Sequence, residues 1–158
     1  MNWNELFEYI PHSSGLQWKA SRSPWLNGTV AGSINSRGYW VVSIGGVKKK
    51  THVIVWEMHH GPTPQGFLID HKDGDKLCNL IENLRPATRS QNCWNAAKPK
   101  TNTSGHKGIC WNKKSQLWQV QIKVNRRPIY GGCFQTIEDA IACRDRLAAS
   151  LHGQFARA

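Results

Sequence analysis

The chain has 158 residues, with 21 Lys and Arg against 10 Asp and Glu and a formal net charge of +11. About 100–200 residues per domain allow one domain or two small ones. An apolar content of 39% with eight Trp excludes a disordered basic tail. No apolar run approaches the roughly 18 residues of a membrane-spanning helix. Such a basic chain predicts a polyanionic partner, and nucleic acid is the first candidate.

The first residues, Met-Asn-Trp-Asn-Glu, lack the basic-then-apolar layout of a signal peptide. The cysteines are odd in number, widely spaced and without a C-x-x-C pair: Cys78, Cys93, Cys110, Cys133 and Cys143. This usage argues against a disulfide framework and a zinc ribbon. We therefore expect a protein of a reducing cytoplasm, with no membrane association and no structural zinc.

The first elements in chain order are short. A helix is expected from Glu5 to Ile10, where Pro11 ends it. Residues 39–44 are rich in strand formers, and the following Gly-Gly pair favours a hairpin with residues 47–50. A helix is then expected from His52 to about His59, with Thr51 as its cap.

The next segment predicts a strand, a loop, a second strand and a helix. Residues 67–69 are apolar and deliver Asp70 and His71 to the end of a strand. A turn-forming Asp-Gly-Asp follows, and a second short strand passes through residues 83–85. Thr88 and Gln91 have the spacing of a capping box, so a helix should begin there with Asn92 in its first turns.

The positive charge is concentrated in the second part of the chain. Residues 1–95 hold 10 Lys and Arg against 7 Asp and Glu, whereas residues 96–158 hold 11 against 3. A polar, basic stretch with Pro and Gly separates the two parts. We therefore predict a first domain at residues 1–97, a linker at 98–104 and a second domain at 105–158.

The second domain predicts three strands followed by a helix. The strands are expected at residues 108–111, 117–124 and 128–131. In the middle strand, apolar and polar side chains alternate, which is typical of a sheet with one buried and one polar face. Residues 136–151 have the apolar spacing of a helix that Gly153 ends.

Four polar residues of the first domain form the sharpest chemical signal: Asp70, His71, Asn83 and Asn92. A magnesium-type cation binds hard oxygen ligands, often only one or two of them from the protein. A neutral imidazole beside it can take a proton from an attacking water. The alternative is a plain surface loop, because Asp-His is a common pair and Asn near a helix start is usually a cap.

Four segments together resemble the HNH endonucleases of phages and mobile introns over about residues 1–95. They are H-V-I-V-W-E from His52, D-H-K-D-G-D-K-L-C-N from Asp70, E-N-L-R from Glu82 and T-R-S-Q-N from Thr88. The resemblance implies a ββα-metal core at about residues 67–97. The third letter of the motif matches Asn92, as in the H-N-N branch of the family.

The resemblance also implies a role for each matching residue. His71 is the general base, Asp70 and Asn92 hold Mg²⁺ or Mn²⁺, and Asn83 pins the loop through backbone hydrogen bonds. Asn95, one turn later, is the competing metal ligand. Two questions stay open: His52 either touches the scissile phosphate or caps and packs, and the flanking Arg85 and Arg89 either grip phosphates or are solvated.

The second domain resembles an AP-two/ERF DNA-binding domain over about residues 104–156. The matching residues include S-G-H-K-G-I from Ser104, G-G-C-F-Q-T-I-E-D-A from Gly131 and A-A-S-L-H-G from Ala148. The resemblance implies a three-stranded antiparallel sheet that lies in the major groove and packs on one helix. Polar side chains can pair with base edges and basic ones with phosphates. The DNA-contact candidates are Lys107, Trp111, Lys113, Lys114, Gln119, Gln121, Lys123, Arg126, Arg127 and Tyr130.

The sequence therefore predicts an α+β protein with a nuclease domain followed by a DNA-binding domain. The expected activity is metal-dependent hydrolysis of phosphodiester bonds in double-stranded DNA, by a monomer encoded by a phage and acting in a bacterial host. The alternative is a non-catalytic DNA-binding regulator that retains a nuclease fold. The presence of Asp70, His71, Asn83 and Asn92 together favours the enzyme.

Overall fold

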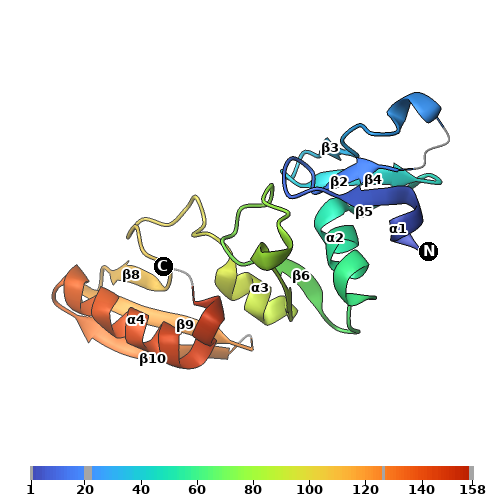
Figure 1. Ribbon diagram of the computed structural model, residues 1–158. Helices are drawn as coiled ribbons and strands as arrows, with labels where there is room; N and C mark the ends of the chain where they lie inside the picture. Colours follow the sequence, from blue (N-terminus) through green and yellow to red (C-terminus); the bar gives the residue numbers. More distant parts are fainter. Residues whose placement is uncertain (1, 20–22, 126, 157–158) are drawn as a thin grey trace. The chain divides into compact units, whose positions relative to one another are not determined.

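The computed structural model describes residues 2–19, 23–125 and 127–156. The chain divides into two compact units, Met1–Thr88 (unit 1) and Arg89–Ala158 (unit 2). Both units combine helices with antiparallel sheets, which agrees with the expected α+β class (Figure 1). None of the described helices is long and apolar enough to cross a membrane.

Unit 1 begins with a short helix and a hairpin. Helix α1 covers Trp3–Leu6, and strands β1 (Phe7–Tyr9) and β2 (Leu16–Trp18) pair in antiparallel register. The expected helix from Glu5 to Ile10 is therefore wrong from Phe7 onward. Phe7 is buried against Trp18, with ring centroids 4.6 Å apart, and this packing favours the extended backbone.

A three-stranded sheet follows in the order β3-β4-β5, after the short 3₁₀ helix Pro24–Leu26. Its strands are β3 (Ser33–Ile34), β4 (Trp40–Ile44) and β5 (Val47–Lys50). The predicted hairpin between β4 and β5 is confirmed, with both Gly45 and Gly46 at positive φ. Helix α2 (Thr51–His60) starts at once after β5, so its cap is Lys50 and not Thr51.

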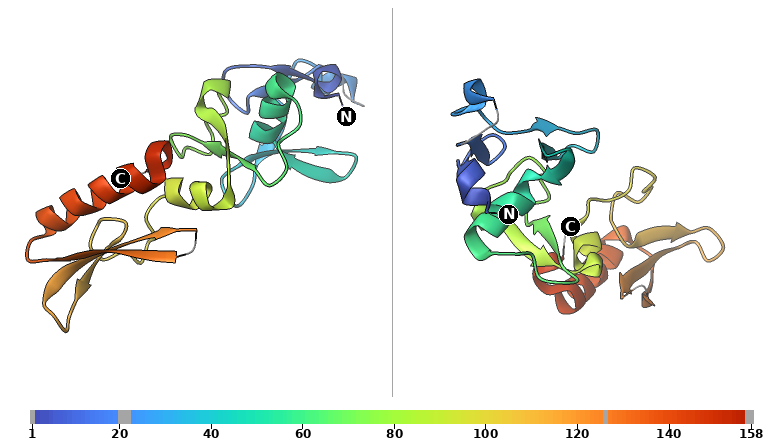
Figure 2. Two further views of the ribbon diagram at one scale, coloured as in Figure 1. Left: turned by 90° about the horizontal axis from the view of Figure 1, so that it is seen from below. Right: turned by 90° about the vertical axis from the view of Figure 1, so that its right-hand side faces the viewer.

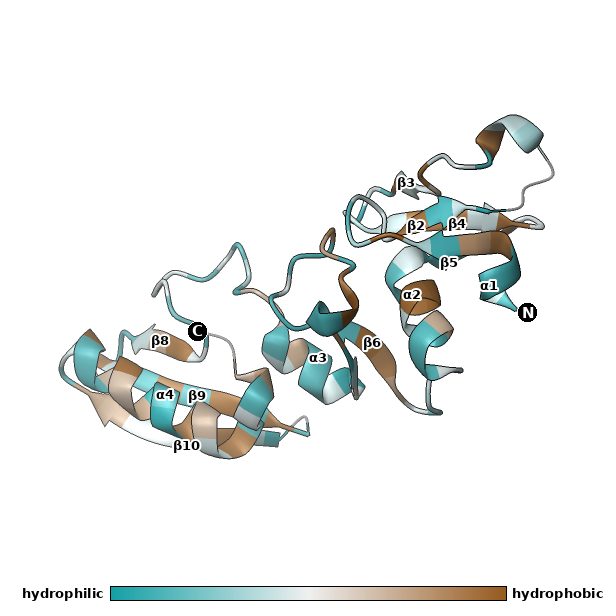
Figure 3. Cartoon of the chain, viewed as in Figure 1, coloured by the Kyte–Doolittle hydropathy of each residue, from teal (hydrophilic) through white to brown (hydrophobic). Residues whose placement is uncertain are grey.

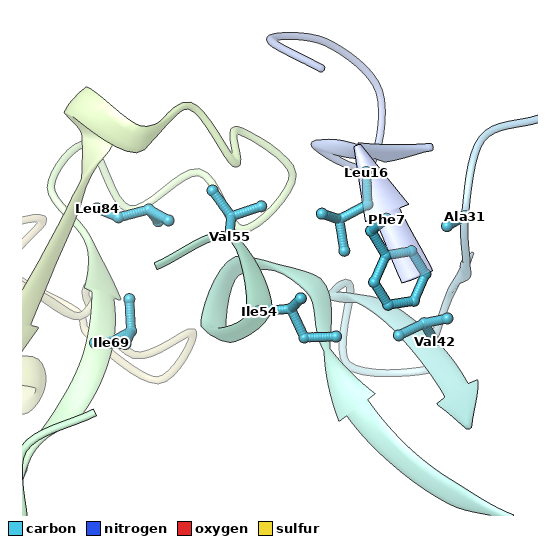
Figure 4. Close-up of a cluster of buried hydrophobic side chains, with 8 residues drawn as sticks. All are labelled: Phe7, Leu16, Ala31, Val42, Ile54, Val55, Ile69 and Leu84. Atoms are coloured by element: carbon cyan, nitrogen blue, oxygen red, sulfur yellow. The ribbon is translucent and has the colours of Figure 1, made fainter. Parts of the chain in front are cut away.

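The core of unit 1 lies on both sides of α2. Figure 4 shows Ile54 directed towards Phe7, Leu16, Ala31 and Val42, whereas Val55 faces the side of Ile69 and Leu84. Adjacent helix residues point about 100° apart, so α2 joins the N-terminal strands to the strands that follow it. The helix thereby fixes the position of the site described below.

Strands β6 (Leu68–His71) and β7 (Leu84–Ala87) form a two-stranded antiparallel sheet. The first residues of β6 are apolar (Figure 3), and its last two are Asp70 and His71. A loop and a 3₁₀ helix (Ile81–Asn83) connect the strands. The register places Asp70 opposite Arg85 and His71 opposite Leu84.

Unit 2 contains a short helix, α3 (Arg89–Asn95), and a sheet covered by a long helix (Figure 2). The sheet order is β10-β9-β8, and all its pairs are antiparallel. Its strands are β8 (Ile109–Asn112), β9 (Leu117–Val124) and β10 (Arg127–Phe134). Helix α4 (Ile137–His152) is capped by the Thr136 side chain, and a 3₁₀ turn (Gly153–Phe155) follows it.

The predicted alternation in β9 is confirmed. Val120 and Ile122 are buried, whereas Gln121 and Lys123 are exposed. On the buried face the sheet approaches α4 closely at Gly131, where an added Cβ would lie 2.7 Å from side-chain atoms of Leu147 and Val120. One face of this sheet is thus closed by α4, and the polar side chains of β9 lie on the other.

Candidate active site and nucleic-acid surface

The two residues at the end of β6 are almost fully buried. Asp70 is 7% exposed and His71 is 4% exposed. The pairing with β7 holds their backbone, so their side chains occupy defined positions at the edge of the unit 1 core. Burial of a histidine and a carboxylate requires specific polar partners.

A neighbouring amide determines which nitrogen of His71 carries its proton. The Asn79 Nδ2 group donates to the Ser14 carbonyl oxygen (2.7 Å) and to Thr51 Oγ1 (2.8 Å). The Ser14 carbonyl can only accept, so the Asn79 Nδ2 group must face it, and Asn79 Oδ1 faces His71 Nε2 at 3.1 Å. Asn79 Oδ1 therefore accepts a hydrogen bond from His71 Nε2. In neutral His71 the lone pair is therefore on Nδ1, which is the atom able to act as a base.

A second histidine packs against the first. His52, on the first turn of α2, is 2% exposed, and its ring centroid lies 4.6 Å from that of His71. Burial, followed by the charges of His71 and Lys50, lowers the pKa of His52 to about 3. His52 is thus neutral at physiological pH. Among the described residues its Nδ1 has no hydrogen-bond partner.

Asp70 forms a buried ion pair with Arg85. Both Nε and Nη2 of Arg85 lie 3.3 Å from Asp70 Oδ2. Arg85 is only 7% exposed, so little of its guanidinium surface is available to DNA. The sequence left open whether Arg85 grips a phosphate or is solvated. In the structure its side chain instead holds the Asp70 carboxylate.

Asn83 holds the loop between β6 and β7. Its Nδ2 group donates to the Cys78 carbonyl and to Asp73 Oδ1, each at 2.9 Å. Its Oδ1 accepts from the Asp73 backbone N–H at 3.2 Å. These bonds are of the kind that the resemblance implies for Asn83, and they place the residue in a supporting position.

Tyr39, which lies near His71, and two lysines at its ring were not among the predicted site residues. The Tyr39 ring lies 5.5 Å from the His52 ring and 6.2 Å from the His71 ring. Lys50 and Lys76 place their ammonium groups 4.0 Å and 4.9 Å from the Tyr39 ring centroid. The run of three lysines at residues 48–50 was a visible signal, but only the fold shows which one faces Tyr39.

The remaining candidates of the first block lie on α3, in unit 2. Arg89 is exposed and Asn92 is half-buried. Asn95 is buried, with 5% of its surface exposed. Trp94, on the same helix, stacks on His152 at the end of α4, with ring centroids 4.3 Å apart and planes 12° apart. Helix α3 is therefore packed as a part of unit 2.

Lys107 closes the C-terminal end of α3. Its ammonium donates to the carbonyl oxygens of Cys93, Trp94 and Ala96 at 2.9, 2.8 and 2.7 Å. A cation at this end also interacts favourably with the helix dipole. A DNA-contact role was expected for Lys107, and the structure places it in this structural role.

Three other DNA-contact candidates are exposed on the polar face of the unit 2 sheet. Gln121, Lys123 and Tyr130 are exposed, and Gln121 pairs with Tyr130 across β9 and β10, so their side chains share a face. Gln119 lies half-buried on the same face. Four further candidates are exposed: Trp111, Lys113, Lys114 and Arg127. Arg126 lies outside the described residues.

A groove of about 670 Å³ adjoins this face. Its lining includes four basic side chains and no acidic one: Arg89, Lys107, Lys123 and Arg144. Trp94 and Ile122 contribute apolar walls. Arg89 was expected in the first domain, and Gln121 and Lys123 in the second. The structure places all three at this one groove.

Comparison with known proteins gives one family match and two related phage proteins. A family model described as HNH endonuclease matches residues 49–93. Protein 3.8 of Escherichia phage T7 is 38% identical over 108 residues, which cover 68% of this chain and 88% of that protein. The Uncharacterized gene 5.3 protein of Enterobacteria phage T3 is 40% identical over 57 residues, 32% of this chain and 56% of that protein. No solved structure matches the chain.

The family match and the identity with the phage T7 protein identify the family. The chain belongs to the family of Protein 3.8 of phage T7 and carries an HNH endonuclease domain at residues 49–93.

Proposed function

We propose that the protein is a metal-dependent endonuclease that hydrolyses phosphodiester bonds in double-stranded DNA. The observation that carries the proposal is the buried His71, whose Nε2 proton is committed to Asn79 and whose Nδ1 carries the lone pair. His71 lies inside the matched HNH segment. A base oriented in this way can act on a water molecule at a phosphate.

In the proposed reaction, His71 Nδ1 takes a proton from water as the water oxygen bonds to phosphorus. The bond from phosphorus to one sugar oxygen then breaks, and that oxygen takes up a proton from solvent as the strand ends separate. Asn83 keeps the loop after β6 in place. Arg85 holds Asp70 by their buried ion pair.

HNH nucleases generally use a divalent metal ion. We propose that Asp70 and Asn92 supply ligands, because carboxylate and amide oxygens are the hard donors that Mg²⁺ and Mn²⁺ bind. Asp70 fits this role as a buried carboxylate that the guanidinium of Arg85 holds in place. The ion would stabilise the negative charge that develops on the phosphate. The role of Asn92, with Asn95 as its competitor, derives from the resemblance.

We assign DNA binding mainly to unit 2, as an AP-two/ERF-like domain. The polar face of β9 would contact base edges through Gln119, Gln121 and Lys123. Positively charged side chains around it would contact phosphates: Arg89, Lys113, Lys114, Arg126 and Arg127. The concentration of positive charge beyond residue 95 supports this division.

Incubation with phage and bacterial duplex DNA tests the function directly. With Mg²⁺ or Mn²⁺ the wild-type protein should cut DNA, and with EDTA it should not. Asp70→Asn should need more metal or lose activity, because few protein ligands hold the ion. Tight DNA binding without cleavage in either metal would refute the enzyme and support the non-catalytic regulator.

A further inference from the structure

Tyr39 gathers two ammonium groups from distant parts of unit 1. Lys50 lies at the junction of β5 and α2, and Lys76 lies in the loop after β6. Their Nζ atoms are 4.0 Å and 4.9 Å from the centroid of the Tyr39 ring. Lys76 also donates to the Arg37 carbonyl oxygen at 3.0 Å. Three chain segments thus hold these cations at one aromatic ring.

The cations repel one another. The pKa of Lys50 is lowered by burial first and then by the positive charges of Arg37 and Lys76. In the described part of the chain, the ion pairs of the two units join other residues, and none includes Lys50, Lys76 or Arg37. Like charges held together without an acidic partner are typical of a surface that receives an anion.

The geometry connects this cluster with the base. The Tyr39 ring that carries the lysines lies 6.2 Å from the His71 ring. Burial and the nearby charge of Asp70 raise the pKa of Tyr39, so the phenol stays neutral at physiological pH. The Tyr39 ring is therefore a shared neighbour of the two lysines and of the histidine that is proposed to activate water.

We propose that Lys50 and Lys76, placed by the Tyr39 ring, form a phosphate-binding site for the backbone of the DNA strand presented to His71. The identity of the ligand as DNA rests on the proposed function, whereas the phosphate chemistry rests on the cluster itself. Lysine suits this role as a compact point charge. Because its contacts are to phosphate, the site would align the DNA strand beside His71 without a contact to any particular nucleobase.

Phosphate binding can be measured without catalysis. The full chain, with labelled tyrosine rings, is titrated with inorganic phosphate in EDTA and followed by NMR. The Tyr39 ring resonances should shift in a saturable manner. Lys50→Met and Lys76→Met should each weaken or abolish this shift, whereas the exposed control Lys48→Met should not. Absence of a Tyr39 shift in the wild-type protein would overturn the site.

A duplex DNA in EDTA provides the second arm. Each of Lys50→Met and Lys76→Met should weaken binding by about two- to tenfold and reduce the salt dependence by about one phosphate contact. Losses no larger than that of Lys48→Met would contradict a specific site. Because neither arm requires cleavage, phosphate binding at Tyr39 in a protein that never cuts DNA would refute the nuclease and leave the site intact.

Discussion

Asn79 gives His71 its chemical character in unit 1. Its amide is oriented by the Ser14 carbonyl and by Thr51, and it therefore presents an acceptor to His71 Nε2. A buried network of this kind is costly to disturb, because each lost partner leaves a desolvated polar group. Ser14 and Thr51, both fully buried, thus hold the Asn79 amide in the orientation that it presents to His71.

His52 makes the stability of the fold depend on pH. Its pKa is about 3 in the folded protein, lowered first by burial, against 6.5 for the unfolded chain. The unfolded state therefore binds an extra proton between these values, and stability is lost as pH falls below about 6.5. At pH 5 this one group should cost about 2 kcal/mol relative to pH 7.5.

Urea unfolding of the full chain at the two pH values tests this. His52→Phe keeps an aromatic ring against His71 and removes the titration, so its stability should fall less between pH 7.5 and pH 5 than that of the wild type. If both proteins lose the same free energy of unfolding, another group causes the pH dependence.

Sequence motifs identified Asp70, His71 and Asn83 as neighbours because they flank one short loop. They could not reveal Asn79 as the partner of His71, because the Asn79 amide is oriented by two residues that are distant in the sequence. Ser14 lies 65 positions and Thr51 lies 28 positions before Asn79. The same holds for the lysines at Tyr39. Local spacing predicts a motif, whereas tertiary packing decides which side chains surround it.

At the scale of elements, α3 shows the largest difference between expectation and structure. Its residues were expected to close the first domain at residue 97, yet the division falls after Thr88. The stacking of Trp94 on His152 and the three hydrogen bonds of Lys107 explain this. These contacts join α3 to the sheet unit through side chains that periodicity does not reveal.

Substitution of Lys107 should therefore loosen α3. Lys107→Met keeps the alkyl stem but removes the three donors, and hydrogen exchange in residues 89–96 should accelerate by about tenfold or more, since such bonds contribute about 1–3 kcal/mol. Hydrogen exchange followed by mass spectrometry measures this.

Lys113→Met removes the same charge from an exposed loop and serves as the control. It should leave the exchange of residues 89–96 unchanged. Equal exchange in Lys107→Met and in the control would show that Lys107 does not hold the helix.

Elements with a strong pattern were predicted well. The alternation of β9 gives its buried and exposed faces, and the Gly-Gly turn gives the β4–β5 hairpin. The helix expected from Glu5 to Ile10 failed because Phe7 is more stable in a strand beside Trp18. Short segments near a sheet follow tertiary packing more than local propensity.

At the scale of the whole molecule, charge and chemistry are distributed unequally. Residues beyond 95 hold 11 Lys and Arg against 3 Asp and Glu, and unit 2 presents an exposed polar strand face. Unit 1 holds the buried His71 and Asp70. The unequal distribution of charge can be read from the composition, whereas the division after Thr88 cannot.

The account depends most directly on His71 as the general base of a DNA nuclease. The decisive measurement compares single-turnover cleavage by the wild-type protein and His71→Ala in Mg²⁺, with DNA affinity measured in parallel in EDTA. Loss of the base should slow cleavage by about 10²–10⁴-fold and leave the affinity nearly unchanged. Cleavage by His71→Ala at the wild-type rate would contradict the account.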